Sequence, residues 1–238
     1  MNISTRAVIL NIIKYNDADA VVKAYTEQTG YTAYFVKNFY KTKTNKYKKA
    51  FLQPGALLQM IISKNNRGEL QYIKDINVLY HYKNIHQDFD KMNIATFIRE
   101  LLIQSLKNEH GDPKLFQFVF DSFIELDKSM QPANFHLFFM LHFTKYLGFF
   151  PNLEQDGKYF DMLNGQISKQ KSDNQHLDEN ETLLLKRISG MIFALKNEAS
   201  IDAIDRKKFI NLMLDYYRLH IEQFHIPNSV KILHRIYE

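Results

Sequence analysis

The stretch from residue 37 to residue 54, KNFYKTKTNKYKKAFLQP, concentrates side chains that can hold a polyanion. Aromatic residues, notably Tyr40 and Tyr47, are interleaved with its lysines. Ammonium groups at irregular spacing can follow the phosphates of a strand, and aromatic rings offer faces on which unpaired bases stack. This basic stretch therefore predicts a nucleic-acid contact; a solvated loop whose lysines only aid solubility is the alternative. Its six lysines, uninterrupted by any acid, are Lys37, Lys41, Lys43, Lys46, Lys48 and Lys49.

Positive charge is concentrated in the first third of the chain. Residues 1–80 contain 12 Lys and Arg against 5 Asp and Glu, whereas the other 158 residues contain 19 against 21. A local positive field of this kind attracts polyanions, of which nucleic acid is the commonest. Because contacts between lysine and phosphate carry no sequence information, the pattern predicts binding without a preferred base sequence.

Two pairs of carboxylates are candidates for magnesium binding or acid–base chemistry. Asp121 and Glu125 share a face of an expected helix, and Asp17 and Asp19 lie in a short turn. Such a pair can hold the metal of a nuclease. Pairs of this kind are common on helices and in turns, so we favour ordinary surface acids and keep a metal-dependent nuclease as the weaker alternative.

The remaining residue types argue against a metal, a cofactor or an enzyme. His136 and His142 are six residues apart, which places them on opposite sides of a helix, and His220 and His225 straddle a helix end. The chain has no cysteine, which excludes disulfides and thiolate zinc sites. Its eight glycines form no phosphate-binding loop, and no serine nucleophile motif is visible. We predict no metal, no cofactor and no catalytic residue.

Two smaller basic clusters lie in the second half of the chain. Lys186 and Arg187 form the first, and Arg206, Lys207 and Lys208 form the second. The second cluster is expected in the first turn of a helix, where positive charge opposes the helix dipole at a cost on the order of a few tenths of a kcal/mol. A cluster that lowers local stability can serve a ligand, and a surface accident explains it equally well.

The first eighty residues read as strands joined by short turns. Apolar and β-branched residues fill five segments, with partial alternation in the third. Gly30 suits a turn between paired strands, as does the later segment KNNRGE. Five strands in so short a length suit a small closed barrel, because closure removes sheet edges. The segments are RAVILNIIKY, AVVKAYT, YTAYFVK, ALLQMIIS and LQYIKDINVLY.

From about residue 84 the apolar pattern becomes helical. Ile94, Phe97 and Ile98 recur at helical spacing, and Asp112 is placed to cap a helix that begins at Pro113. The apolar segment FHLFFMLHF is expected in the middle of a helix cluster. The segment from FFPNLE to LDENE reads as a polar connection with little periodicity.

These patterns predict an α+β fold, with a five-stranded barrel in residues 1–82 and an all-helical domain in residues 83–238. Secondary structure and charge both change at this boundary. The N-terminus lacks the features of a signal peptide, and the apolar runs are far shorter than the roughly 20 residues that span a bilayer. We expect a cytoplasmic protein with no membrane partner.

Five segments carry a resemblance to a known family through their order along the chain. They are TRAVILNIIKYNDADAVVKAYTEQTG, FLQPGALLQMII, ELQYIKDI, YLGFFPNLE and NSVKILHRIY. The first three resemble the opening strands, the fourth-strand entry and the fifth strand of the RecO family of bacterial recombination mediators. The fourth is similar to the family's segment after its central helices, and the last to its tail, with Asn228 where lysine is often found. ANFHLFFMLHFTKYLGFFP resembles the Bacteroidetes-type branch.

The resemblance implies an OB-fold N-terminal domain, a helical C-terminal domain, and DNA repair and recombination in the RecF pathway at the bacterial nucleoid. It implies binding of single- and double-stranded DNA and annealing of complementary strands. It also implies three partners: RecR, the C-terminal tail of single-strand-binding protein, and indirectly RecA. DNA contact carries over onto Lys37, Lys41, Lys43 and Lys46, and by extension onto Lys48 and Lys49. Candidates for the rim of a groove for the tail are Lys186, Arg187, Arg206, Lys207 and Lys208.

Many members of that family bear a four-cysteine zinc element just after the segment that YLGFFPNLE resembles. Here the corresponding segment is NLEQDGKYFDMLNG, which has no ligand set and leaves open how it is held. The resemblance implies a mediator that captures strands without bond chemistry. An RNA-binding module that uses the same barrel is the main alternative to a DNA repair mediator.

Overall fold

The computed structural model describes residues 2–41, 46–63, 71–107, 110–171, 175–190 and 201–236. The chain divides into two compact units, residues 1–128 and residues 129–238. The change from strands to helices after Tyr80 lies inside the first unit. The proposed division into domains of residues 1–82 and 83–238 therefore stays a prediction.

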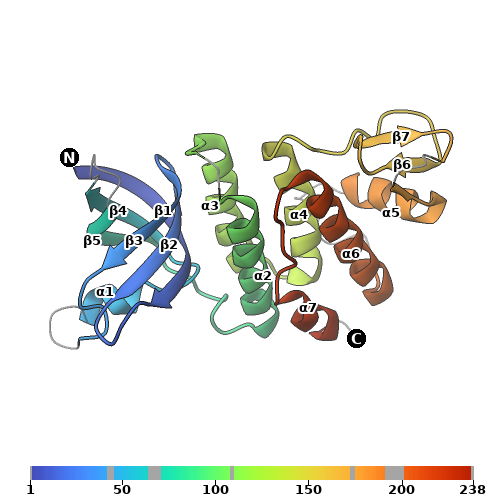
Figure 1. The fold of residues 1–238 in the computed structure, drawn as a ribbon. Coiled ribbons are helices and arrows are strands. Elements are labelled where there is room, and N and C mark those ends of the chain that lie inside the picture. The colour runs from blue at the N-terminus through green and yellow to red at the C-terminus, as the bar shows by residue number, and fades with distance from the viewer. Residues whose placement is uncertain are drawn as a thin grey trace. The chain divides into compact units, whose positions relative to one another are not determined.

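Five strands of the first unit form a closed barrel in the order β1-β2-β3-β5-β4 (Figure 1). β3 and β5 pair in parallel, and the other neighbouring strands pair antiparallel. A five-stranded barrel followed by helices confirms the predicted fold class, and the barrel has the build of an OB-fold. The strands are β1 (Asn2–Lys14), β2 (Ala20–Thr26), β3 (Gly30–Val36), β4 (Leu57–Ser63) and β5 (Gln71–Tyr80).

β1 is buried on both faces in its middle. Ala7 and Ile9 belong to the apolar core inside the barrel. Val8 and Leu10 point the other way and are also fully buried, because β1 contacts helix α2 (Phe89–Ser105). The run of apolar residues in this strand is thus explained by two packing surfaces rather than one.

A β-bulge at Leu10 interrupts the pairing of β1 with β2. β1 pairs with β4 from Asn2 to Val8 and with β2 from Ala7 to Lys14, and the register with β2 shifts between Ile9 and Asn11. Arg99 of α2 donates a hydrogen bond of 3.1 Å from Nη1 to the Leu10 carbonyl. Burial lowers the pKa of the Arg99 guanidinium. A bulge bends its strand, and here a cation from the covering helix contacts the carbonyl at the bend.

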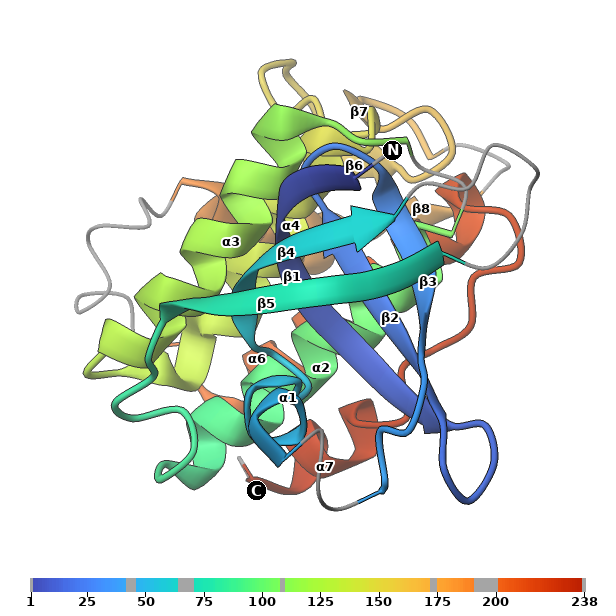
Figure 2. The ribbon, with the colours of Figure 1, turned by 90° about the vertical axis from the view of Figure 1, so that its left-hand side faces the viewer.

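The connection between β3 and β4 contains a short helix, α1 (Lys46–Phe51), which Figure 2 shows beside the barrel strands. The sequence pattern did not predict this helix. Six residues make less than two turns, too short for a helical apolar period to be recognised. Phe39 before the helix and Leu52 after it are buried in the barrel core, so both ends of the connection are anchored.

Two helices complete the first unit, α2 and α3 (Pro113–Lys128). Asp88 caps α2 by accepting from the Lys91 N–H at 3.1 Å. The Asp112 carboxylate accepts from the N–H groups of Lys114 and Leu115 at 2.8 and 3.2 Å. The expected cap at Asp112 and start at Pro113 are confirmed.

Asp127, near the end of α3, forms hydrogen bonds with the segment that connects the barrel to α2. Its carboxylate accepts from the backbone N–H groups of Lys83, Asn84 and Ile85 at 2.8 to 3.0 Å. The Asp127 carbonyl accepts from the Lys91 ammonium at 2.8 Å. Burial acts to raise the pKa of Asp127, but these backbone bonds outweigh it and hold the pKa below its ordinary value.

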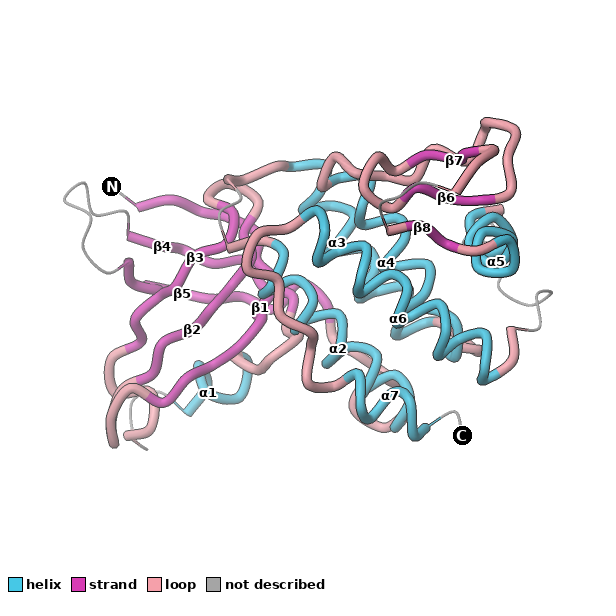
Figure 3. The backbone as a smooth tube through the Cα atoms, turned by 45° about the vertical axis from the view of Figure 1, so that its right-hand side comes forward, coloured by secondary structure: helices cyan, strands magenta, loops and turns pink. Residues whose placement is uncertain are grey.

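The second unit contains the expected helices and a small sheet that the sequence analysis did not anticipate (Figure 3). Three strands of two or three residues lie in the order β7-β6-β8, inside the segment read as an irregular connection. No helix of the described part of the chain is both long and apolar enough to cross a membrane. The elements are η1 (Pro132–Asn134), α4 (Phe135–Tyr146), β6 (Tyr159–Asp161), β7 (Gln166–Ser168), β8 (His176–Leu177), α5 (Glu179–Ser189), α6 (Ala203–His220) and α7 (Val230–Ile236).

Candidate nucleic-acid interface

The start of the basic stretch is held by the hairpin between β1 and β2. Asn38 follows Lys37 and adopts a left-handed conformation with φ of 57°. Asp19 accepts a hydrogen bond of 2.7 Å on Oδ1 from the Asn38 N–H, and the Tyr40 N–H donates to the Ala18 carbonyl at 2.9 Å. The exposed Lys37 therefore leaves the barrel from a fixed turn.

Asp19 carries its negative charge at the root of the basic stretch. The backbone bond from Asn38, followed by the side-chain bond from Asn16, lowers the pKa of Asp19. The positive charges of Lys37 and Lys41 lower this pKa further. One carboxylate thus faces the first two lysines of the stretch and orders the backbone between them.

Tyr40 packs into the protein instead of standing free. Its ring meets the buried Phe39 ring edge to face, with centroids 5.0 Å apart. The Lys49 ammonium lies 5.5 Å from the centroid of the Tyr40 ring. Tyr40 is partly buried against the barrel core, whereas Lys41 and Lys49 are exposed. The Lys49 ammonium therefore already lies over the Tyr40 ring, where a base would stack.

Part of the predicted site lies outside the described residues. Lys43 falls in the segment 42–45, which the structure does not describe. Lys46, Tyr47 and Lys48 form part of the α1 backbone, but their side chains are likewise outside the description. The structure therefore brings together Lys37, Tyr40, Lys41 and Lys49 beside one end of the barrel and says nothing of the other four side chains.

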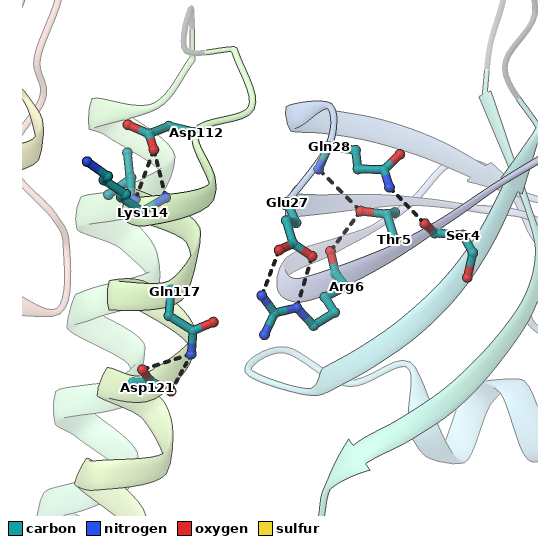
Figure 4. A network of polar contacts seen from close by, with 10 residues as sticks. Ser4, Thr5, Arg6, Glu27, Gln28, Asp112, Lys114, Gln117 and Asp121 are labelled. Carbon is teal, nitrogen blue, oxygen red and sulfur yellow. Dashed lines mark hydrogen bonds and ion pairs between the residues drawn. The ribbon is translucent and has the colours of Figure 1, made fainter.

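Arg6 shows that not every cation of the first eighty residues is available to a ligand. Its guanidinium donates to both carboxylate oxygens of Glu27 at 2.9 and 2.7 Å, as Figure 4 shows. The guanidinium carbon also lies 5.2 Å from the centroid of the Phe116 ring of α3. The hydrogen bond from Arg6 is the main cause that lowers the pKa of Glu27. We assign Arg6 to packing between the barrel and α3.

The candidate metal-binding acids are engaged by neighbouring side chains. Both carboxylate oxygens of Asp121 accept from the Gln117 amide at 2.8 Å (Figure 4). Glu125 lies 3.6 Å from the Lys128 ammonium, and Asp17 lies 2.7 Å from that of Lys14. Among the residues that the structure describes, no three His, Asp or Glu side chains gather as a metal site would need.

The two basic clusters of the second unit come together across α5 and α6. Arg187 of α5 pairs with Asp205 of α6 at 2.5 Å, and Lys208 of α6 lies 3.8 Å from Glu181 of α5. Arg206 donates to the Ile201 carbonyl at 2.7 Å. Lys186 is half-buried and Lys207 is exposed.

The expected placement of the second cluster in the first turn of its helix was wrong. α6 begins at Ala203, after the cap residue Asp202, and its first turn carries the acid Asp205. The basic residues follow this acid, so the start of the helix is charged favourably for its dipole. The Asp205 N–H donates the capping hydrogen bond to the Asp202 side chain, so the helix begins before this acid.

Comparison with known proteins identifies the family. The protein-family model described as "Recombination protein O N terminal" matches residues 1–82, and the family model described as "Recombination protein O C terminal" matches residues 86–229. The chain belongs to the RecO family. Relatives named DNA repair protein RecO from Christiangramia forsetii and Flavobacterium psychrophilum are 32% and 31% identical, over 100% of both chains in each case. A Porphyromonas gingivalis protein of the same name is 24% identical over the same coverage.

The small sheet occupies the position where the resemblance to RecO proteins implied a zinc element. Without cysteine and without a described cluster of other ligands, these residues do not fit a zinc ion. Hydrogen bonds hold the segment instead: the Asn152 N–H donates to the Gly165 carbonyl at 2.8 Å, and Asp161 accepts from the Asn164 N–H at 2.9 Å. The buried Phe160 ring packs against Tyr216 of α6.

The second unit of this RecO-family chain also contains an open pocket of about 860 Å³. Its walls come from β8, α5 and α6, and they combine apolar side chains with charges of both signs. Lys208 is the one member of the predicted groove rim that lines it. The charged and apolar side chains at the pocket include Leu177, Glu181, Lys208, Leu212, Asp215, Arg218 and Leu219.

Proposed function

We propose that this RecO-family DNA repair protein binds single- and double-stranded DNA through the basic stretch and anneals complementary strands. The observation that carries the proposal is the anchoring of the basic stretch to an OB-fold barrel by Asp19, with Lys37, Lys41 and Lys49 exposed. OB-folds commonly bind oligonucleotides, and lysines on a fixed turn can follow a phosphate backbone with less loss of conformational entropy. The proposed contacts are Lys37, Tyr40, Lys41, Lys43, Lys46, Tyr47, Lys48 and Lys49.

The proposed mechanism uses electrostatics and involves no bond chemistry. Two DNA strands held near one cationic surface repel each other less, because the lysines neutralise part of their charge. Complementary segments then meet more often and pair without ATP. In the cell, the protein would work with RecR at the nucleoid to load RecA onto single strands covered by single-strand-binding protein.

The second unit is the proposed docking site for the C-terminal tail of single-strand-binding protein. The pocket beside α5 and α6 offers Leu212 and Leu219 to apolar side chains, and Lys208 and Arg218 to carboxylates. Because Glu181 and Asp215 also line the pocket, the tail must compete with the pairs that Lys208 and Arg218 form with these acids. The remaining proposed rim residues are Lys186, Arg187, Arg206 and Lys207.

A salt titration tests DNA binding by the basic stretch. Each lysine that neutralises a phosphate of single-stranded DNA contributes about 0.7 to the slope of log K against log salt. Replacing Lys37 and Lys41 together with alanine should therefore weaken binding and flatten this slope by about 1.4. Lys145→Ala with Lys231→Ala, which removes two exposed lysines of the second unit, is the matched control. An unchanged slope in the first variant excludes these two lysines as phosphate contacts.

Two further assays address the other parts of the proposal. An acidic, apolar tail peptide should bind the wild-type protein and bind more weakly to Lys208→Glu; equal binding argues against the pocket. Labelled DNA incubated with magnesium or manganese should remain uncut. Cleavage of the DNA by the wild-type protein that is abolished in Asp121→Ala would contradict the mediator function and indicate a metal-dependent nuclease.

A further inference from the structure

The pocket of the second unit carries its charges in pairs of opposite sign. Lys208 of α6 lies 3.8 Å from Glu181 of α5, and Arg218 of α6 lies 3.5 Å from Asp215 of the same helix. All four side chains line the pocket. Among the described Lys, Arg, Asp and Glu residues of the lining, two cations thus stand beside two acids, and their formal charges cancel.

Glu181 is held at the pocket wall by the N-terminal cap of α5. Its Oε2 atom accepts from the Asp178 N–H at 3.0 Å, and the Asp178 carboxylate accepts from the Glu181 N–H at 2.8 Å. These two bonds form a capping box. The other carboxylate oxygen, Oε1, is the one near the Lys208 ammonium. The acid is therefore fixed by the backbone of the helix start, which lies beside β8 (Figure 3).

α6 presents its two cations at separate points of one pocket wall. Lys208, Asp215 and Arg218 recur at helical spacing, so they share the face of α6 that lines the pocket. Lys208 and Arg218 are ten residues apart in the sequence, which corresponds to about 15 Å along the helix. The buried Leu212 lies between them on this face, and Leu177 of β8 adds a second apolar side chain to the lining.

Paired charges distinguish a nucleic-acid strand from a peptide. A strand gains affinity from many phosphates, each of which releases counterions when it meets an uncompensated cation. Beside Lys208 or Arg218 a phosphate also meets the field of the neighbouring acid, which offsets the attraction. A peptide with few carboxylates loses less, and it gains from burying apolar side chains against Leu177 and Leu212.

We infer that Glu181 and Asp215 act as a filter that keeps nucleic acid out of the pocket and leaves the pocket to an acidic, apolar peptide. The filter lets the protein hold DNA on the basic stretch while a peptide tail occupies the second unit, and neither ligand displaces the other. The inference rests on the tail docking proposed above. It adds the two residues that exclude the competing polyanion.

Competition between a peptide and DNA tests the filter. The probe is a labelled peptide with two aspartates and three apolar residues at a free C-terminus, followed by fluorescence anisotropy, and the competitor is unlabelled single-stranded DNA of about 16 nucleotides. Saturating DNA should leave peptide binding to the wild-type protein unchanged. In Glu181→Gln combined with Asp215→Asn, the same DNA should weaken peptide binding at least about fivefold, the factor that one unit charge contributes across about 4 Å of water. Displacement of the peptide from the wild type, or no displacement from the double variant, would overturn the filter.

The matched control is Asp156→Asn with Glu222→Gln. These exposed acids belong to the second unit and lie outside the described pocket lining. This control should resist DNA as the wild type does; if DNA displaces the peptide from it as well, net charge rather than the two pocket acids governs the competition. Glu181→Gln preserves the capping box, because glutamine serves there as glutamate does. Peptide binding by the double variant without DNA verifies that its pocket is folded.

A second measurement separates the filter from tail docking because it uses no peptide. Removing both acids opens Lys208 and Arg218 to phosphates, so the slope of log K against log salt for the same DNA should steepen by up to about 1.4. A steeper slope in a protein that binds no peptide supports the filter and overturns the docking. Peptide binding with an unchanged slope and no displacement overturns the filter and leaves the docking intact. No peptide binding and an unchanged slope overturn both.

Discussion

The carboxylate of Asp19 accepts a hydrogen bond of 2.7 Å from the backbone N–H of Asn38, 19 residues farther along the chain. This bond ties the hairpin between β1 and β2 to the first turn of the basic stretch. Asn38 occupies a left-handed conformation that asparagine tolerates better than most residues. The path of the backbone between Lys37 and Lys41 thus depends on an acid in a different loop.

Replacing Asp19 with alanine should loosen the basic stretch. Trypsin cleaves after lysine only where the backbone can leave its fold, so cleavage after Lys37 and Lys41 should become several-fold faster, as measured by mass spectrometry of the early fragments. Asp17→Ala is the matched control, because the exposed Asp17 pairs only with Lys14 among the contacts described for it. Equal cleavage rates for Asp19→Ala and wild type would show that the bond does not order the stretch.

Asp127 should stabilise the first unit at neutral pH and lose this effect in acid. Its folded-state pKa is lowered below the ordinary value of 3.8, so the stabilisation is present above that value and is lost as pH falls through the folded pKa. Asp127 is only 1% exposed. Asp127→Asn should therefore cost about 2 to 3 kcal/mol in urea unfolding at pH 7. The difference in the free energy of unfolding between variant and wild type should decrease toward pH 3.

The control for this prediction is Asp121→Asn on the same helix. Asp121 is exposed and bonds to Gln117 alone among its described hydrogen-bond partners. Its replacement should change the free energy of unfolding by about 0.5 kcal/mol or less. Similar losses in the two variants, or a gap for Asp127→Asn that stays constant with pH, would contradict the assigned role.

His136 should make the second unit sensitive to mild acid. Burial, with the nearby charges of Arg206 and His234, lowers its pKa from 6.5 to about 3. Between these values the unfolded chain binds a proton that the folded chain excludes, so stability falls as pH falls. The loss is about 1.4 kcal/mol per pH unit. His136→Leu should lose about 2 kcal/mol less than wild type between pH 7 and pH 5, as measured by urea unfolding.

Exposed His225 supplies the comparison for His136. His225→Leu removes an exposed histidine and leaves His136 buried, so the acid dependence that His136 causes should remain in this variant. If His136→Leu and His225→Leu show the same dependence between pH 5 and pH 7, another group causes the acid sensitivity of this unit.

Local patterns predicted the barrel strands and the longer helices because each repeats its apolar period several times. The period shows clearly in Ile94, Phe97 and Ile98 of α2. α1 and the strands of the small sheet were not anticipated because two to six residues are too few for an apolar period to be recognised. These short elements owe their form to packing: Leu52 and Phe160 are each 1% exposed.

The candidate functional residues also differ in whether a local sequence pattern can reveal them. The lysines of the basic stretch adjoin one another in sequence and could be found there. No local pattern specifies strand register, which alone makes Ile13, Val21, Phe35 and Tyr72 neighbours across four strands. Asp19 and Asn38 are 19 residues apart in the chain, so no local pattern predicts their contact either. Tyr40 looked like an open stacking ring in the sequence because the packing of Phe39 and Lys49 around it is tertiary.

Gly157 should be essential to the segment that lacks the zinc element. A Cβ atom added there would clash with the Ser168 carbonyl oxygen, a backbone atom that cannot rotate away as a side chain can. Gly157→Ala must therefore push β7 away, and it should cost about 1 to 3 kcal/mol with faster amide exchange over residues 152–168. In Gly190→Ala, whose added Cβ would meet only ordinary contacts at 3.5 Å or more, exchange there should stay unchanged. Amide exchange in Gly157→Ala as slow as in the wild type would show that the close approach of Gly157 to the Ser168 backbone does not stabilise the segment.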